Sequence, residues 1–279
     1  MAQVSPKQYW KELMDEADVF MKAIMHVPVA ECMEPMVSIR DACKAAKVEV
    51  TFSDLPHIEG LPRLYYLREG LIESFLAVAR DMNAIGWILK VEDAYRTIEM
   101  QRGLGRQFAI FKRVFDKVVW ECDGQKPPVD LLYRRLGAMV ALAPKIGTHQ
   151  SGSAMDVSVI DREAGVEVDR GAPYLEMSEL TPMASPLIPE QAQANRRAIS
   201  DIMFRHGFYA YPYEFWHYSA GDAYEVLLSN NKKLARYGAV SLDQSSGNVT
   251  PVPHPKNMLH SEADIKKMID QLYEENQAE

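Results

Sequence analysis

The sequence predicts an α+β fold. Several segments repeat apolar residues at helical spacing, and shorter segments alternate apolar and polar residues as half-buried strands do. Helices and strands follow one another without the regular strand–helix alternation of a doubly wound parallel sheet. With 279 residues, 47% of them hydrophobic, the chain is long and apolar enough for one large domain or two small ones.

The N-terminal part predicts one long helix and then an irregular stretch. Ser5 and Pro6 have the pattern of a helix N-terminus, with proline at the first helical position, and an apolar stripe continues to about residue 25. Residues 27–62 contain several prolines and predict irregular structure. Within them we expect a short helix near 41–46 and a strand near 48–52.

The middle of the chain predicts helices around one strand. An apolar stripe over about 69–83 indicates a helix, and the alternation over 87–91 indicates a strand. From Thr97 we expect one long helix, with Phe108 among the apolar residues that face inward. A Pro-Pro turn and a short apolar helix follow within 122–147.

The next part carries the clearest strand. Residues 154–159 alternate, with apolar side chains on one face and Asp156 on the other. A loop-rich segment, 161–190, leads to a helix over about 190–206 that ends at a glycine, the usual left-handed cap. Residues 208–219, FYAYPYEFWHYS, predict a strand pair or a bent strand.

The C-terminal part predicts an extended tail and a last helix. The Pro-rich stretch VTPVPHPKN, residues 249–257, is expected to be extended. Ser261 and Asp264 have the spacing of a capping box, and an apolar stripe after them predicts a helix to about residue 276.

Composition argues against several kinds of partner. A net charge of −8 does not provide the basic face that nucleic acid requires. No apolar run approaches the ~18 residues that span a bilayer, and the first residues lack the pattern of a signal peptide. The three cysteines have no spacing typical of a zinc ribbon or a redox pair. We therefore expect a cytoplasmic protein with reduced thiols and neither a nucleic-acid nor a membrane partner.

The stretch GTHQSGSAMDVSV, residues 147–159, contains candidate metal ligands. Catalytic zinc takes imidazole nitrogens and carboxylate oxygens from three protein ligands, and His149 and Asp156 offer one of each. The Ser151–Ser153 connection contains a glycine, which helps the chain to bend both side chains toward one ion. Taken singly, His149 favours a loop histidine bonded to backbone, and Asp156 fits a strand carboxylate paired with an arginine.

Two further segments offer catalytic groups. Glu214 and His217 are three positions apart, so on a regular strand they would point to opposite faces. They share a site only if the chain bends between them; otherwise His217 bonds a neighbour and Glu214 lies on the rim. Arg96 follows a strand and precedes a helix, a position from which it reaches a cleft or forms a surface ion pair with Glu92 or Asp93.

Several segments together resemble one protein family. GTHQSGSAMDVSV resembles the S-x-H-x-x-G-x-A-x-D motif of the D-alanyl-D-alanine dipeptidases, a zinc peptidase family related to D,D-carboxypeptidases and hedgehog domains. EFWHY, from Glu214, resembles its E-x-W-H motif, and EDAYRTIEMQ, from Glu92, resembles its D-x-Y-R segment. The motifs occur in the family's order across roughly residues 60–225, and two such motifs together are specific.

The resemblance implies a fold, a cofactor and catalytic roles. The fold would be a small mixed, mainly antiparallel sheet flanked by helices, as in hedgehog and D,D-peptidase domains. One Zn²⁺ per chain would be held by His149, Asp156 and His217. Glu214 would be the general base that activates the zinc-bound water, and Arg96 would be the electrophilic partner of the carbonyl oxygen.

The substrate-binding residues follow less directly. Gly147 stands where the family motif has a serine that is implicated in holding substrate. Thr148 and Ser153 are candidates to replace that serine. A free dipeptide also has an ammonium group, for which the loop at 171–190 offers Glu176 as a candidate partner and Tyr174 as a pocket residue.

The resemblance also divides the chain. Residues 1–60 would be an N-terminal helical extension that packs on the core, 61–235 the catalytic domain, and 236–279 a Pro-rich tail with a C-terminal helix.

The expected activity is hydrolysis of D-Ala-D-Ala or a related small D-dipeptide. A D,D-carboxypeptidase or endopeptidase acting on peptidoglycan peptides and a non-catalytic zinc-binding domain remain alternatives. The terminal helices are candidates for restricting the cleft or for a homodimer contact.

Overall fold

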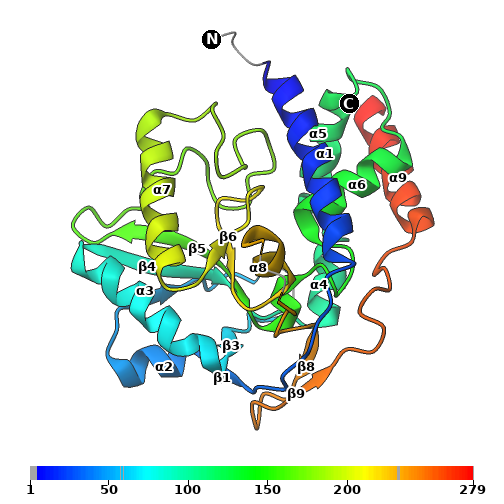
Figure 1. Cartoon of the computed structure of the whole chain (residues 1–279). Helices are drawn as coiled ribbons and strands as arrows, with labels where there is room; N and C mark the ends of the chain where they lie inside the picture. The colour runs from blue at the N-terminus through cyan, green and yellow to red at the C-terminus, as the bar shows by residue number, and fades with distance from the viewer. Residues whose placement is uncertain (1–4, 57, 59, 231–232, 279) are drawn as a thin grey trace.

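A five-stranded sheet forms the centre of the protein. A computed structural model describes residues 5–56, 58, 60–230 and 233–278 (Figure 1). The strand order is β2 (Val50–Phe52), β4 (Trp87–Asp93), β5 (Ala154–Asp161), β7 (His217–Ser219) and β6 (Tyr209–Ala210). β2 runs parallel to β4, and the other neighbours are antiparallel. The predicted α+β fold with a small mixed, mainly antiparallel sheet is confirmed.

Two short antiparallel ribbons accompany this sheet. In one, β1 (Met36–Ser38) pairs with β3 (Tyr66–Arg68). In the other, β8 (Val240–Leu242) pairs with β9 (Val249–Pro251). The Pro-rich tail, which we expected to be extended, therefore begins as a strand.

Three helices share one apolar core with the sheet. They are α2 (Ile39–Ala46), α3 (Ile72–Ala84), which follows the 3₁₀ turn η1 (Glu69–Leu71), and α7 (Glu190–Arg205). The apolar stripe of α3 is buried among the inward-facing residues of β4 and β5. This core lies on one side of the molecule (Figure 1).

A second core joins helices from both ends of the chain. Its helices are α1 (Pro6–Ile24), α5 (Phe108–Glu121), α6 (Val129–Val140), α8 (Ala223–Leu228) and α9 (Glu262–Ala278). Figure 1 shows α1, α5, α6 and α9 grouped beside the sheet. α1 buries Trp10, Met14, Ala17, Met21 and Ile24, the stripe expected from the sequence. The terminal helices thus pack on the body of the protein.

Helix ends follow their sequence patterns. Pro6 is the first residue of α1, as predicted. The capping box before α9 is confirmed, because Ser261 Oγ accepts from the Asp264 backbone N–H and Asp264 Oδ2 accepts from the Ser261 backbone N–H. α7 is followed by Gly207 at φ 88°, a conformation that glycine adopts without strain.

The single long helix expected from Thr97 is wrong. The chain forms α4 (Ile98–Leu104), capped by the Thr97 hydroxyl, and then breaks before α5. At Gly105 a Cβ would lie 2.6 Å from His260 Nε2, so this close approach requires glycine. The break turns Phe108 outward, and its side chain is 55% exposed rather than buried.

The expected boundary at residue 60 separates segments that are paired in space. β2 belongs to the central sheet, and β1 pairs with β3 across the boundary. The division into 1–60, 61–235 and 236–279 stays a prediction. Among the described residues, none of the helices is both long and apolar enough to cross a membrane.

Candidate active site

Three elements bring His149, Asp156 and His217 together. His149 lies on the 3₁₀ turn η2 (Thr148–Ser151), and Gly152 follows at φ 69° and directs the chain into β5. Asp156 on β5 and His217 at the start of β7 are partners in the antiparallel register, so their side chains share a face. The glycine-containing loop predicted from the sequence thus folds His149 back over the strand that carries Asp156.

The three side chains present a donor set that suits zinc. His149 Nε2 lies 3.2 Å and His217 Nδ1 3.1 Å from Asp156 Oδ1. All three ligand atoms lie within 4.8 Å of one another, and all three residues are buried. Two imidazole nitrogens and one carboxylate oxygen are the ligands that catalytic zinc takes. The residues therefore fit the metal that the sequence implied.

The ring nitrogens of His149 and His217 that do not face Asp156 contact other groups. His149 Nδ1 lies 2.5 Å from the carbonyl oxygen of Ala94, and because a carbonyl only accepts, Nδ1 carries the proton and Nε2 presents its lone pair inward. His217 Nε2 lies 2.9 Å from Thr148 Oγ1. Such outer contacts orient the rings of metal-ligating histidines.

The electrostatics favour the ligand forms of these groups. Burial, followed by the charge of Arg96, lowers the pKa of His149, which keeps the imidazole neutral. Burial alone would raise the pKa of the Asp156 carboxyl, but the adjacent His149 and His217 side chains and the charge of Arg96 hold it well below its usual value. A neutral histidine and an ionised carboxylate are the states that bind metal.

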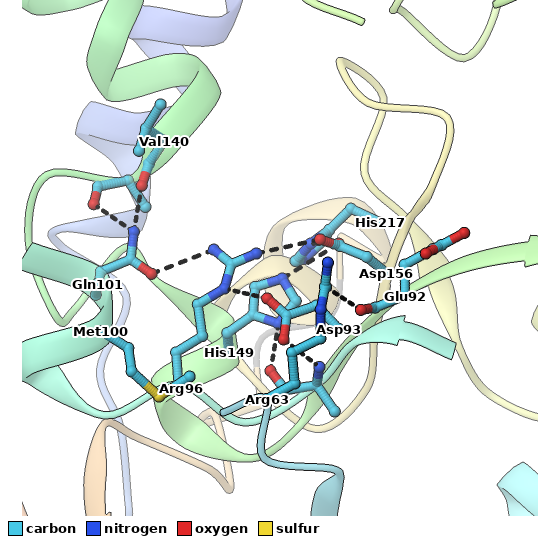
Figure 2. Close-up of polar contacts among 12 residues, drawn as sticks. Arg63, Glu92, Asp93, Arg96, Met100, Gln101, Val140, His149, Asp156 and His217 are labelled. Carbon is cyan, nitrogen blue, oxygen red and sulfur yellow. Dashed lines mark hydrogen bonds and ion pairs between the residues drawn. The ribbon is translucent and has the colours of Figure 1, made fainter. Parts of the chain in front are cut away.

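A polar network holds the second oxygen of Asp156. Arg96 Nη2 lies 3.2 Å and the Tyr174 hydroxyl 2.9 Å from Asp156 Oδ2. Arg96 also donates from Nε to Asp93 Oδ2 at 2.6 Å and from Nη1 to Gln101 Oε1 at 3.3 Å (Figure 2). Arg96 and Tyr174 contact Oδ2 whereas both histidines contact Oδ1, so the two donors hold the carboxylate with Oδ1 toward the ligand set.

Glu214 reaches the site because the chain turns before β7. Residues 211–216 form two turns between β6 and β7, and the backbone N–H of Glu214 donates to Tyr211 O at 3.3 Å. The regular strand that would have placed Glu214 and His217 on opposite faces is absent from this described segment. Burial and the charge of Asp156 raise the pKa of Glu214 well above its usual value. Phe215 and Trp216 are core residues.

One cavity collects the expected catalytic residues. Arg96, His149, Asp156, Glu214 and His217 all line it, and it contains about 530 Å³ of space between atoms, part of it open to solvent.

Only some of the residues expected to bind substrate line the cavity. Thr148 and Gly147 line the cavity. Tyr174 touches Asp156, as described above. Ser153 is instead buried behind the site, where its hydroxyl donates to Asp222 Oδ2 at 2.8 Å. Glu176 lies between two residues that line the cavity, but it does not line the cavity itself.

Sequence reasoning missed two partners of Arg96. Asp93 was considered only for a surface ion pair, yet its side chain is fully buried. Gln101 donates to the carbonyl oxygens of Val140 and Ala141 while it accepts from Arg96 (Figure 2). Both residues lie within EDAYRTIEMQ, so that segment was the available indication. The contact with α6 could not be predicted from it.

A buried two-histidine, one-carboxylate set beside a buried glutamate defines a metallopeptidase centre. The model of the family described as D-ala-D-ala dipeptidase, Peptidase_M15, matches residues 64–235. The chain belongs to this family of zinc metallopeptidases.

The chain is also similar to individual known proteins. A D-alanyl-D-alanine dipeptidase of Synechocystis sp. is 27% identical over 257 residues, which cover 80% of this chain and 98% of the relative. A D-alanyl-D-alanine dipeptidase of Escherichia coli is 33% identical over 75 residues, 27% of this chain and 38% of the relative. The solved structure of the LdcB LD-carboxypeptidase has a TM-score of 0.37 and 19% identity, covering 73% of this chain and 78% of that one.

Proposed function

We propose that this metallopeptidase hydrolyses D-Ala-D-Ala or a related D-amino-acid dipeptide, with one Zn²⁺ per chain. The observation that carries the proposal is the convergence of three zinc-type ligand atoms and a buried glutamate in one cavity. The names of the relatives support the substrate class.

Three atoms would hold the metal: His149 Nε2, Asp156 Oδ1 and His217 Nδ1. When bound, zinc acidifies water and polarises a carbonyl group. The protein's own part is to aim both imidazoles inward, to keep His149 neutral, and to keep Asp156 ionised with Oδ1 free for the ligand set. The contacts of Ala94, Thr148, Arg96 and Tyr174 do this.

Glu214 would act as general base and then as general acid. Its carboxylate takes a proton from the attacking water as the new C–O bond forms, and delivers it to the amine nitrogen as the C–N bond breaks. Burial raises its pKa, which makes the carboxylate a stronger base than an exposed one. A stronger base is better matched to abstracting a proton from water near neutral pH.

Arg96 would stabilise the carbonyl oxygen in the transition state. A guanidinium has five N–H donors, and contacts with Asp93, Gln101 and Asp156 use one on each of its three nitrogens. The group lines the cavity with its side chain 10% exposed, so its orientation is fixed before substrate arrives. Preorganised donors of this kind stabilise a developing oxyanion without reorganisation.

An amino-acid release assay on L,L, L,D, D,L and D,D dipeptides tests the substrate class. We expect hydrolysis of D,D substrates that a chelator abolishes, and poor hydrolysis of N-acetylated or longer peptides ending in D-Ala-D-Ala. Equal rates on the free dipeptide and on a wall pentapeptide would contradict a dipeptidase and favour a carboxypeptidase. A cytoplasmic location belongs to the same proposal, and cell fractionation tests it.

A further inference from the structure

The cavity is lined by polar side chains and by apolar side chains, which we call its polar face and its apolar face. The polar face carries the catalytic residues described above. We define the apolar face by six of the larger lining side chains, from four helices and from the loop between β5 and α7; all but the partly buried Leu175 are buried. They are Met21 on α1, Leu104 on α4, Ile110 on α5, Met139 on α6, and Leu175 and Met177 in the loop.

The acidic, basic and imidazole side chains that line the cavity already have proposed roles in metal binding or catalysis. Among the described residues that line it, those with acidic, basic or imidazole side chains are Arg96, His149, Asp156, Glu214 and His217. A substrate side chain that extends away from these groups therefore meets the apolar face. The two methyl groups of D-Ala-D-Ala are small compared with that face.

Methionines make this face adaptable. Three of its six residues, Met21, Met139 and Met177, have unbranched, polarisable side chains that adjust to differently shaped apolar partners. A larger apolar side chain would remove more of this surface from water, and the hydrophobic gain grows with the area removed.

α1 contributes to this face from outside the segment that matches the family. Residues 64–235 match the family model, whereas Met21 lies on the N-terminal helix. The Tyr224 hydroxyl lies 3.6 Å from Met21 Sδ, and the neighbouring Phe20 packs against the rings of Tyr211 and Tyr224. These contacts hold Met21 at the cavity.

We infer that the preferred substrate of this enzyme is a D,D-dipeptide with one large apolar side chain, and that Met21 helps to set this preference. The inference rests on the proposed function and narrows its substrate class. The apolar face receives the large side chain, while the scissile bond lies against the catalytic face.

Relative kcat/KM values test the substrate preference. The wild-type protein with zinc is assayed on D-Ala-D-Ala, D-Ala-D-Leu, D-Leu-D-Ala, D-Ala-D-Phe and D-Phe-D-Ala. At least one leucine or phenylalanine dipeptide should exceed D-Ala-D-Ala by roughly tenfold or more, since a single methylene in a fitted apolar pocket is worth about 10–200-fold. If D-Ala-D-Ala is the best substrate, this inference fails and the proposed function stands. If no D,D-dipeptide is hydrolysed, both fail.

Met21→Ala tests the role of α1, with Met14→Ala as its matched control. Both methionines are buried on α1, but only Met21 is among the residues that line the cavity. Met21→Ala should change the phenylalanine-to-leucine ratio of kcat/KM by roughly fivefold or more in favour of phenylalanine, because space is opened. Met14→Ala should leave that ratio unchanged.

A volume-conserving variant covers the case in which Met21→Ala does not fold. Met21→Leu keeps the volume but alters the shape of the face, and such exchanges are usually tolerated. It should also shift the phenylalanine-to-leucine ratio. The same ratio in Met21→Leu, or equal shifts in the Met21 and Met14 variants, would overturn the role of Met21.

Discussion

At the scale of single residues, the two oxygens of Asp156 have separate tasks. Oδ1 faces both histidines, and Oδ2 accepts from Arg96 and Tyr174. A carboxylate held on one oxygen presents the other in a fixed direction, which favours a single ligand geometry. The candidate metal site is thus organised by residues outside the proposed ligand set.

Tyr174→Phe should weaken zinc binding while the fold is retained. The change removes one donor to Asp156 Oδ2, and loss of such a contact typically lowers metal affinity by about 10–100-fold. Zinc affinity is measured by competition with a chromophoric chelator. Tyr133→Phe is the control, because that hydroxyl bonds the carbonyl of His260 away from the site. Equal zinc affinity in the Tyr174 variant and the wild type would refute this positioning role.

Glu214→Gln should separate chemistry from metal binding. Gln keeps the size of the side chain but cannot accept the proton, so kcat should fall by about 10²–10⁴-fold. Zinc content, measured by atomic absorption, should remain that of the wild type. Turnover near the wild-type rate would show that Glu214 has been given the wrong role.

Arg96→Lys should lower kcat and kcat/KM together, with little change in KM. Lysine cannot reproduce the fork that contacts Asp93, Gln101 and Asp156 at once. Loss of an interaction that is made mainly in the transition state lowers both kcat and kcat/KM. Steady-state kinetics at saturating zinc provide the measurement. A rise in KM alone would instead make Arg96 an anchor for the substrate carboxylate.

At the scale of elements, a buried polar network fixes α1 against α5 and α6. Trp10 Nε1 donates to Glu121 Oε2 at 3.0 Å, and Arg135 Nη2 lies 2.6 Å from Glu121 Oε1. All three side chains are buried. Since α1 also supplies Met21 to the cavity, this network positions one wall of the site.

Arg135→Ala should destabilise the protein far more than loss of an exposed pair does. Removing one partner of a buried ion pair leaves an uncompensated charge and costs about 3–5 kcal/mol. Lys266→Ala removes the i,i+4 contact with Asp270, which is exposed and worth about 0.3–0.5 kcal/mol. The shift of the denaturation midpoint in urea distinguishes the two. Equal shifts would contradict the structural importance of this network.

Elements were predictable where local pattern and tertiary packing agree. The stripe of α1, the strand that carries Asp156 and the capping box of α9 all match the sequence. The break after Leu104 was missed because the apolar spacing continues through it. Gly105, at this break, lies close to His260, which is 155 positions away, and such a distant contact leaves no local pattern.

At the scale of the whole molecule, the site depends on contacts between distant segments. The motifs placed His149, Asp156 and His217 in one site because each motif is short: His149 and Asp156 are seven positions apart, and Glu214 and His217 are three apart. The apolar face of the cavity could not be predicted, because Met21 and Met139 have the spacing of ordinary core residues on their helices. Only the packing of α1 and α6 beside the sheet brings these methionines to the cavity.

Titration of zinc into metal-free protein tests the central claim most directly. Release of D-amino acids from a D,D-dipeptide is followed as zinc is added to chelator-treated protein. The wild type should regain activity linearly up to one zinc per chain, and His217→Ala should bind little zinc and regain almost none. Full activity in the metal-free protein, or full zinc content in both His149→Ala and His217→Ala, would contradict a zinc centre at these residues.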